Sequence, residues 1–148
     1  SNLNIKFFIT IAHKDFEKIF GNYSENIINL GPVPLKSCPS IYKQCDALFM
    51  PSLLEVYSAS YLEAMKMSKP ILSSNLSFAK DVCGDAALYF DPLDEKDISN
   101  KITKLANDKE LVNILTKNGI KRLTELETAK TRAKKYLDII LKVAANEY

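Results

Sequence analysis

Several residue types are scarce in this chain of 148 residues, and each scarcity excludes a class of site. The four glycines form neither a GxGxxG nor a GxxxxGK[ST] phosphate-binding loop. The single histidine, His13, cannot supply a histidine metal cluster. The three cysteines, Cys38, Cys45 and Cys83, form no CxxC pair, and their odd number and wide spacing are typical of reduced thiols. The sequence therefore predicts no metal site and no dinucleotide site of these motif types.

Long apolar runs and a strong charge of one sign are also missing. No apolar run reaches about 18 residues, so no segment is expected to span a membrane, and no signal peptide is visible. A net charge of +2 gives no reason to expect a nucleic-acid partner. Hydrophobic residues make up 47% of the chain and charged residues 26%, which is the composition of one globular domain with its own core.

Short apolar segments alternate with helical patterns in the first part of the chain. Strands are predicted at residues 5–11, 26–30, 47–50, 70–73 and 87–90. Helices are predicted between them at 13–20, 37–45, 60–67 and 78–82, and apolar residues continue at helical spacing from Ile98 to the end. Nearly all-apolar strands that alternate with helices indicate an α/β fold, in which a parallel sheet is buried by helices on both faces.

The loop after the third predicted strand carries two glutamates. Ligands bind to such sheets beyond the carboxyl ends of the strands. Glu55 lies in this loop, and Glu63 is expected in the first turn of the helix that follows. Free N–H groups at a helix N-terminus bind phosphate, and a carboxylate accepts hydrogen bonds from neighbouring sugar hydroxyls. Two carboxylates beside a phosphate site are suited to a nucleotide-sugar.

Other short motifs surround these glutamates. They are Asp46-Ala47, Pro51-Ser52, Glu63-Ala64-Met65, Lys69-Pro70-Ile71-Leu72 and the run from Cys83 to Pro92. Together with Glu55, they resemble the carboxyl-terminal, donor-binding domain of retaining glycosyltransferases with the GT-B fold, of the group 1 or family 4 type. The resemblance implies a Rossmann-like parallel sheet flanked by helices. One departure is Val56-Tyr57-Ser58, where the family commonly has Gly-Phe-Gly.

The resemblance also implies a role for individual residues. Glu63 would bind the ribose hydroxyls of the nucleotide, and Glu55 would contact hydroxyls of the donor sugar. The amides that would face the diphosphate belong to Val56, Tyr57, Ser58, Ala59 and Ser60. An apolar wall for the base would come from Pro32, Val33 and Pro34, in the loop after the second strand. No catalytic residue and no metal ligand is assigned within the sequence.

The family's organisation implies that residues 1–148 form one nucleotide-sugar-binding domain. The amino-terminal acceptor domain, and the first strand and basic loop of the donor half, would lie outside them. The whole enzyme would use a UDP-sugar or GDP-sugar, without a metal or further cofactor, and transfer the sugar to a glycan or lipid-linked acceptor. The chain alone would bind donor weakly and transfer nothing.

The expected setting is the synthesis of bacterial capsule, lipopolysaccharide or exopolysaccharide. The expected location is the cytoplasm, with peripheral contact at the inner face of the cytoplasmic membrane as a possibility. Two other functions stay open at this point. A nucleotide-sugar epimerase shares the GT-B architecture, and a non-catalytic binding or scaffold domain is compatible with Val56-Tyr57-Ser58.

Three residue patterns have simpler structural interpretations. Ser60 and Glu63 fit a capping box, in which Glu63 accepts a hydrogen bond from the Ser60 N–H. Glu55 alone would be a solvated loop charge. The last helix carries lysines and an arginine beside its apolar stripe, so it either packs on its own domain or contacts the acceptor domain or an anionic membrane.

Overall fold

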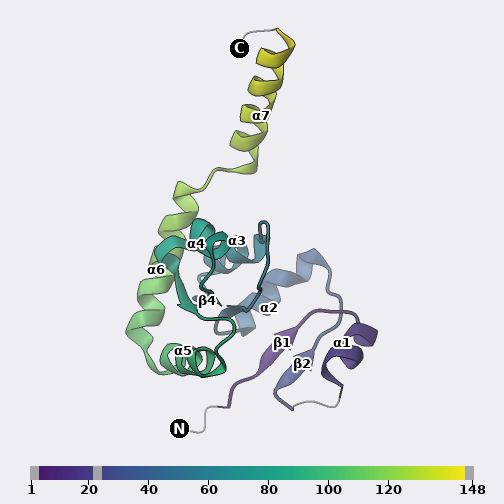
Figure 1. Cartoon of the computed structure of the whole chain (residues 1–148), viewed down its shortest axis with the longest axis vertical. Coiled ribbons are helices and arrows are strands. Elements are labelled where there is room, and N and C mark those ends of the chain that lie inside the picture. The colour runs from purple at the N-terminus through teal and green to yellow at the C-terminus, as the bar shows by residue number, and fades with distance from the viewer. Residues whose placement is uncertain (1–3, 22–24, 146–148) are drawn as a thin grey trace.

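The computed structural model describes residues 4–21 and 25–145, in which strands and helices alternate (Figure 1). The strands are β1 (Phe7–Ile9), β2 (Ile27–Asn29), β3 (Leu48–Met50), β4 (Ile71–Ser74) and β5 (Ala87–Phe90). The helices are α1 (His13–Phe20), α2 (Cys38–Gln44), α3 (Ala59–Lys66), α4 (Ser77–Cys83), α5 (Glu95–Asn107), α6 (Lys109–Glu125) and α7 (Ala129–Ala144). Single 3-10 turns precede α2 (Leu35–Ser37) and β5 (Gly84–Ala86). The predicted α/β class is confirmed.

The strands form two parallel sheets, where the sequence predicts one. β1 pairs with β2, and Phe8 lies opposite Ile28. β4 lies between β3 and β5, with Leu72 opposite both Phe49 and Leu88. Among the described strands, β1 and β3 are not hydrogen-bonded neighbours. A cavity lined by both strands lies between the two sheets, which touch where the ring centroids of Phe7 and Phe49 are 5.3 Å apart.

The hydrophobic core covers both faces of the three-stranded sheet. Successive side chains of a strand point to opposite faces: Ile71 joins a cluster with Tyr61 of α3, and Leu72 joins a second cluster with Leu105 of α5. Of the five described strands, β4 alone is buried at every residue. The expected burial of all strands on both faces is therefore wrong for the other four, because only β4 has a strand on each side and helices over both faces.

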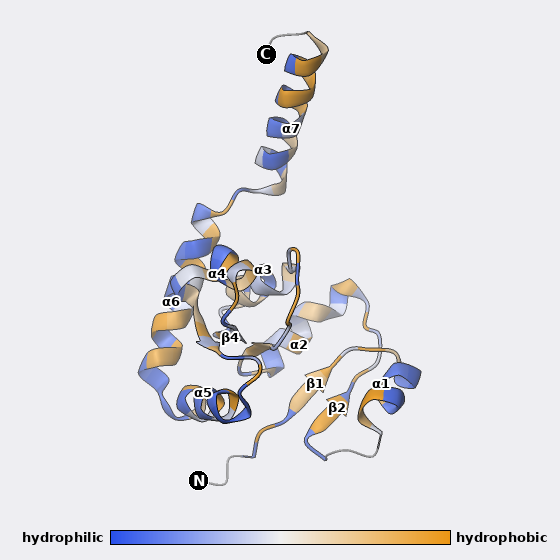
Figure 2. Cartoon of the chain, viewed as in Figure 1, coloured by the Kyte–Doolittle hydropathy of each residue, from blue (hydrophilic) through white to orange (hydrophobic). Residues whose placement is uncertain are grey.

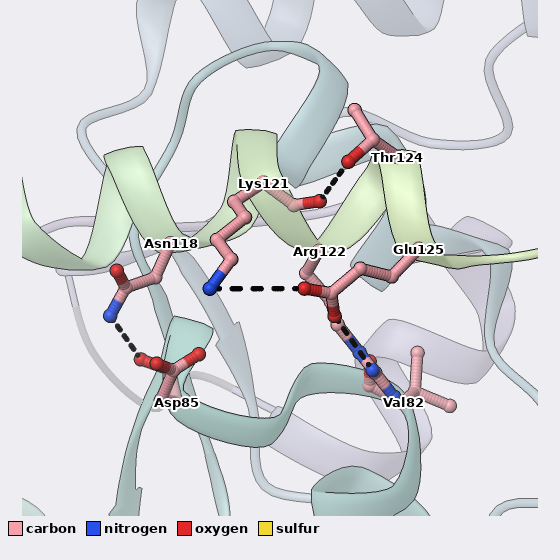
Figure 3. A network of polar contacts seen from close by, with 7 residues as sticks. All are labelled: Val82, Asp85, Asn118, Lys121, Arg122, Thr124 and Glu125. Carbon is pink, nitrogen blue, oxygen red and sulfur yellow. Dashed lines mark hydrogen bonds and ion pairs between the residues drawn. The ribbon is translucent and has the colours of Figure 1, made fainter.

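Helix α6 packs against α3. It also donates hydrogen bonds to the end of α4 and to the 3-10 turn that follows it (Figure 3). A Cβ built on Gly119 would lie 3.2 Å from Cγ of Met65, so the missing side chain allows close approach of α6 and α3. Arg122 donates from Nε to the carbonyl of Val82 at 2.9 Å and from Nη2 to the carbonyl of Asp81 at 2.8 Å. The last four carbonyls of a helix have no partner within it. Arg122 therefore caps the carboxyl end of α4.

Helix α7 extends away from the other elements, and hydrophobic and hydrophilic residues alternate along it (Figures 1 and 2). Its exposed apolar residues, at 50% to 63%, are Tyr136, Leu137, Ile139, Ile140, Leu141 and Val143. No residue of α7 is buried. Of the three interpretations left open for this helix, packing on its own domain is therefore wrong. Across the described ranges, every helix is too short or too polar to cross a membrane.

Candidate functional site

The cavity between the two sheets has a volume of about 1160 Å³ and runs along both β1 and β3. At the carboxyl ends of these strands its lining includes Val33, Ser60 and Glu63. One residue from each of the predicted base, phosphate and ribose sites thus lines the same cavity. The other predicted site residues are not part of its lining: Pro32, Pro34, Glu55, Val56, Tyr57, Ser58 and Ala59.

Helix α3 begins one residue earlier than the sequence suggests. Ser58 is at the N-cap position with extended backbone, and Ala59 is the first helical residue. Glu63 therefore lies in the second turn, and Ser60 lies inside the helix, so the capping-box interpretation of this pair is wrong. No side chain in the described ranges caps α3. The N–H groups of its first turn consequently lack an acceptor within the helix.

The carboxylate of Glu63 contacts a residue that the sequence did not single out. The Tyr42 hydroxyl, on α2, donates to Oε2 of Glu63 at 3.2 Å and lies 3.4 Å from the carbonyl of Ser60. Burial raises the pKa of Tyr42 to about 12, and the negative charge and hydrogen bond of Glu63 act in the same direction. One feature of the sequence could have indicated Tyr42 as a site residue: it is a polar aromatic residue on the helix that leads into β3.

Glu55 is partly buried in the loop between β3 and α3. Its Oε1 accepts a hydrogen bond from the N–H of Val56 at 3.2 Å. One of the five amides predicted to face the diphosphate is therefore already engaged by a carboxylate. The Val56 side chain is 94% exposed, and the guanidinium of Arg132 on α7 lies 5.4 Å from the centre of the Tyr57 ring. Tyr57 thus reaches the first turn of α7, whereas Pro51, at the start of this loop, lines the cavity.

The loop after β2 turns sharply at Gly31, where φ is 71°. A Cβ at this position would lie 3.0 Å from Nε2 of His13, so the turn requires glycine for both its conformation and its space. Oδ1 of Asn29 accepts hydrogen bonds from the N–H groups of Gly31 at 3.0 Å and Ile11 at 3.3 Å. Asn29 therefore ties the loops after β1 and β2 together, and Val33 follows this anchored turn. His13 lies beside the turn, and its Nδ1 is 3.5 Å from Nδ2 of Asn29.

Known proteins provide an independent comparison with this chain. Residues 20–122, more than half of it, match the family described as glycosyl transferases group 1. An O-antigen chain mannosyltransferase B from Escherichia coli is 34% identical over 62% of this chain and 24% of its own length. A sucrose-phosphate synthase from Spinacia oleracea is 30% identical over 57% of this chain and 9% of its own length. The chain thus spans less than a quarter of the length of these relatives.

Solved structures agree with the family match at the level of the fold. A sucrose-phosphate synthase from Thermosynechococcus elongatus superposes on 90% of this chain and 34% of its own, with a TM-score of 0.74 and 18% identity. TarM superposes on 84% of this chain and 25% of its own, with a TM-score of 0.65 and 16% identity. The chain therefore belongs to the group 1 glycosyl transferases and has the α/β architecture of a GT-B domain.

Proposed function

We propose that this chain is the donor-binding half of a retaining glycosyltransferase and that its cavity holds the nucleotide of a nucleotide-sugar. One observation carries the proposal: Val33, Ser60 and Glu63 line the same cavity. An apolar side chain, the first turn of a helix and a carboxylate are the groups that a base, a diphosphate and a ribose need. They come from one loop and one helix, the loop after β2 and α3, which are far apart in the sequence.

Each subsite follows from the chemistry of its residues. The Glu63 carboxylate accepts hydrogen bonds from the ribose hydroxyls, and the base lies against Val33, with Pro32 and Pro34 beside it. The uncapped first turn of α3 faces the diphosphate, because its free N–H groups and the helix dipole favour negative charge. Glu55 contacts the sugar of the donor, and the donor is a UDP-sugar or a GDP-sugar. Backbone amides bind the diphosphate in this arrangement, without a metal ion or further cofactor.

We infer that three parts of the whole protein lie outside these 148 residues: the acceptor-binding domain, the first strand of the donor half and its basic loop. The separation of β1 from β3 supports this organisation, because one further parallel strand between them would pair with both. A longer form of the protein should then protect the backbone amides of both strands from hydrogen exchange. Protection unchanged from that of the 148-residue chain would contradict this organisation.

The exposed apolar face of α7 is proposed to pack on that acceptor-binding domain. Its apolar residues are half exposed or more, and the relatives are several times longer than this chain. Deleting residues 129–148 from the full-length protein should weaken association of the two halves. Capture of the chain by vesicles of phosphatidylcholine and phosphatidylglycerol, lost on that deletion, would instead assign the basic, apolar α7 to a membrane surface.

The proposed reaction moves the sugar to a hydroxyl of a glycan or lipid-linked acceptor, with the anomeric configuration retained. The similarity to an O-antigen chain mannosyltransferase favours a role in bacterial surface polysaccharide synthesis. Product analysis by NMR of the full-length protein tests this reaction. An inverted product, or an epimerised nucleotide-sugar without an acceptor, would contradict it. The 148-residue chain alone should show no transfer.

A nucleotide titration tests the binding site directly. Adding UDP, GDP, ADP and CMP to the ¹⁵N-labelled chain should shift the resonances of Val33, Ser60 and Glu63 for one base selectively, with a dissociation constant of about 1 mM. Glu63→Ala should weaken this binding about tenfold, because it removes a charged hydrogen-bond acceptor. The matched control is Glu125→Ala, on the outer face of α6. Absence of shifts at high nucleotide concentration, or an unchanged affinity in Glu63→Ala, would overturn the proposal.

A further inference from the structure

We propose that Tyr42 is a positioning residue that holds the Glu63 carboxylate in the orientation in which it accepts the ribose hydroxyls. This inference rests on the proposed function, because it assigns the partner of the same carboxylate. Tyr42 and Glu63 are 21 residues apart and lie on different helices, α2 and α3. Both side chains line the cavity between the sheets. Their contact therefore joins two walls of the candidate site.

The hydrogen bond uses only one part of the carboxylate. Within the described residues, the Tyr42 hydroxyl is the one donor to Glu63, and it contacts Oε2. A carboxylate has about four lone-pair sites on its two oxygens. Oε1 and the remaining lone pair of Oε2 are thus left for a ligand that carries two neighbouring hydroxyls. Tyr42 fixes the plane of the carboxylate without occupying the atoms that such a ligand needs.

The placement of Glu63 makes a second anchor necessary. Its backbone is rigid, because Tyr61, Ala64 and Met65 on the same helix are at most 1% exposed. Its side chain has several rotatable bonds, and ordering a long side chain costs on the order of 1 kcal/mol of conformational entropy. The Tyr42 hydroxyl orders the carboxylate before the ligand arrives. The Glu63 side chain then loses little further conformational entropy when the nucleotide binds.

The protonation state of the Tyr42 phenol indicates a positioning role and not a role as a base. A raised pKa keeps Tyr42 protonated throughout the neutral range, so it donates its hydrogen bond permanently and cannot accept a proton there. Its single proton has a second acceptor nearby, the Ser60 carbonyl, but the contact with Glu63 is shorter. Tyr42 therefore serves as a hydrogen-bond donor to Glu63 and not as a base at neutral pH.

The test is a comparison of two nucleotides in Tyr42→Phe. This variant keeps the ring and removes the donor, so UDP or GDP, whichever the wild type binds, should bind about threefold to tenfold more weakly. The matching 2′,3′-dideoxynucleoside diphosphate should bind both proteins equally, because it has no hydroxyls for Glu63 to accept. The control is Tyr89→Phe, which removes a hydroxyl bonded to the Gly84 carbonyl at 2.7 Å, outside the cavity lining. It should leave both affinities unchanged.

A second readout needs no nucleotide. The Tyr42 titration followed by ¹³C NMR should lie near 12 in the wild type and move to lower pH in Glu63→Gln, because the negative charge beside the phenol is gone. An unchanged Tyr42 pKa in Glu63→Gln would overturn the contact itself.

The outcomes distinguish this inference from the proposed function. If Glu63→Ala leaves nucleotide affinity unchanged, the proposed ribose site is wrong. If Glu63→Ala weakens binding but Tyr42→Phe does not, only the positioning role is wrong. Equal weakening of the ribose and dideoxy nucleotides in Tyr42→Phe would also overturn positioning, because the hydroxyl would then act on the fold and not through the ribose.

Discussion

The two parallel sheets of this protein are built from similar apolar strands, yet they are held in different ways. In the three-stranded sheet, Ile71 and Phe90 are at most 1% exposed. In the two-stranded sheet, Phe8 is 45% exposed, and no described residue of β1, α1 or β2 belongs to the buried hydrophobic core. The difference comes from the neighbours of each sheet, since helices cover both faces of β4 but leave β1 open to the cavity. Strand composition alone does not determine burial.

The candidate site lies where these two regions meet. Glu63 belongs to the well-packed region, on a helix whose neighbouring residues are fully buried. Val33 belongs to the open region, on a loop anchored by Asn29 and His13. A ligand in the cavity would therefore contact both regions, and its binding would stabilise the less packed one.

The largest expected effect comes from truncating the core of the three-stranded sheet. Phe90→Ala should lower the free energy of unfolding by about 3–5 kcal/mol, because it leaves a cavity at a side chain that is 1% exposed. The matched variant in the two-stranded sheet, Phe8→Ala, should cost less than about 1 kcal/mol. Urea unfolding followed by circular dichroism measures both. Equal losses would mean that the two sheets are packed alike.

An intermediate effect is expected where α6 caps α4. Arg122→Ala should lower the free energy of unfolding by about 1–3 kcal/mol, because the carbonyls of Asp81 and Val82 lose their hydrogen-bond donor. Lys121→Ala is the control: its Nζ lies 3.9 Å from Glu125 in a surface ion pair, and such pairs contribute little. Thermal unfolding of both variants provides the comparison. A loss in Lys121→Ala as large as that in Arg122→Ala would contradict the capping role.

The smallest effect is expected for α7. A chain that ends at Glu127 should unfold with a free energy within about 0.5 kcal/mol of the full chain, because no residue of α7 is buried. Chemical denaturation of the two chains tests this expectation. A large loss of stability would mean that α7 packs on the domain in solution.

The sequence predicted the order of elements well, since apolar periodicity is a local property. The strand at 87–90 and the helix at 13–20 have the predicted bounds, and other elements end within a few residues of theirs. Periodicity could not reveal the split between β1 and β3, because strand pairing depends on distant residues. The resemblance placed Val33 and Glu63 in one site. Tyr42 was missed, because its contact with Glu63 spans 21 residues and two helices.

The α/β class, the positions of the strands and the motifs around Glu55 and Glu63 can be read from the sequence alone. These properties follow from periodicity and from short motifs, which local residues carry. Three features are visible only in the folded chain: which strands pair, that α7 extends from the domain, and that the Tyr42 hydroxyl contacts the Glu63 carboxylate. Each of these depends on which surfaces meet in space, and packing between distant segments sets that.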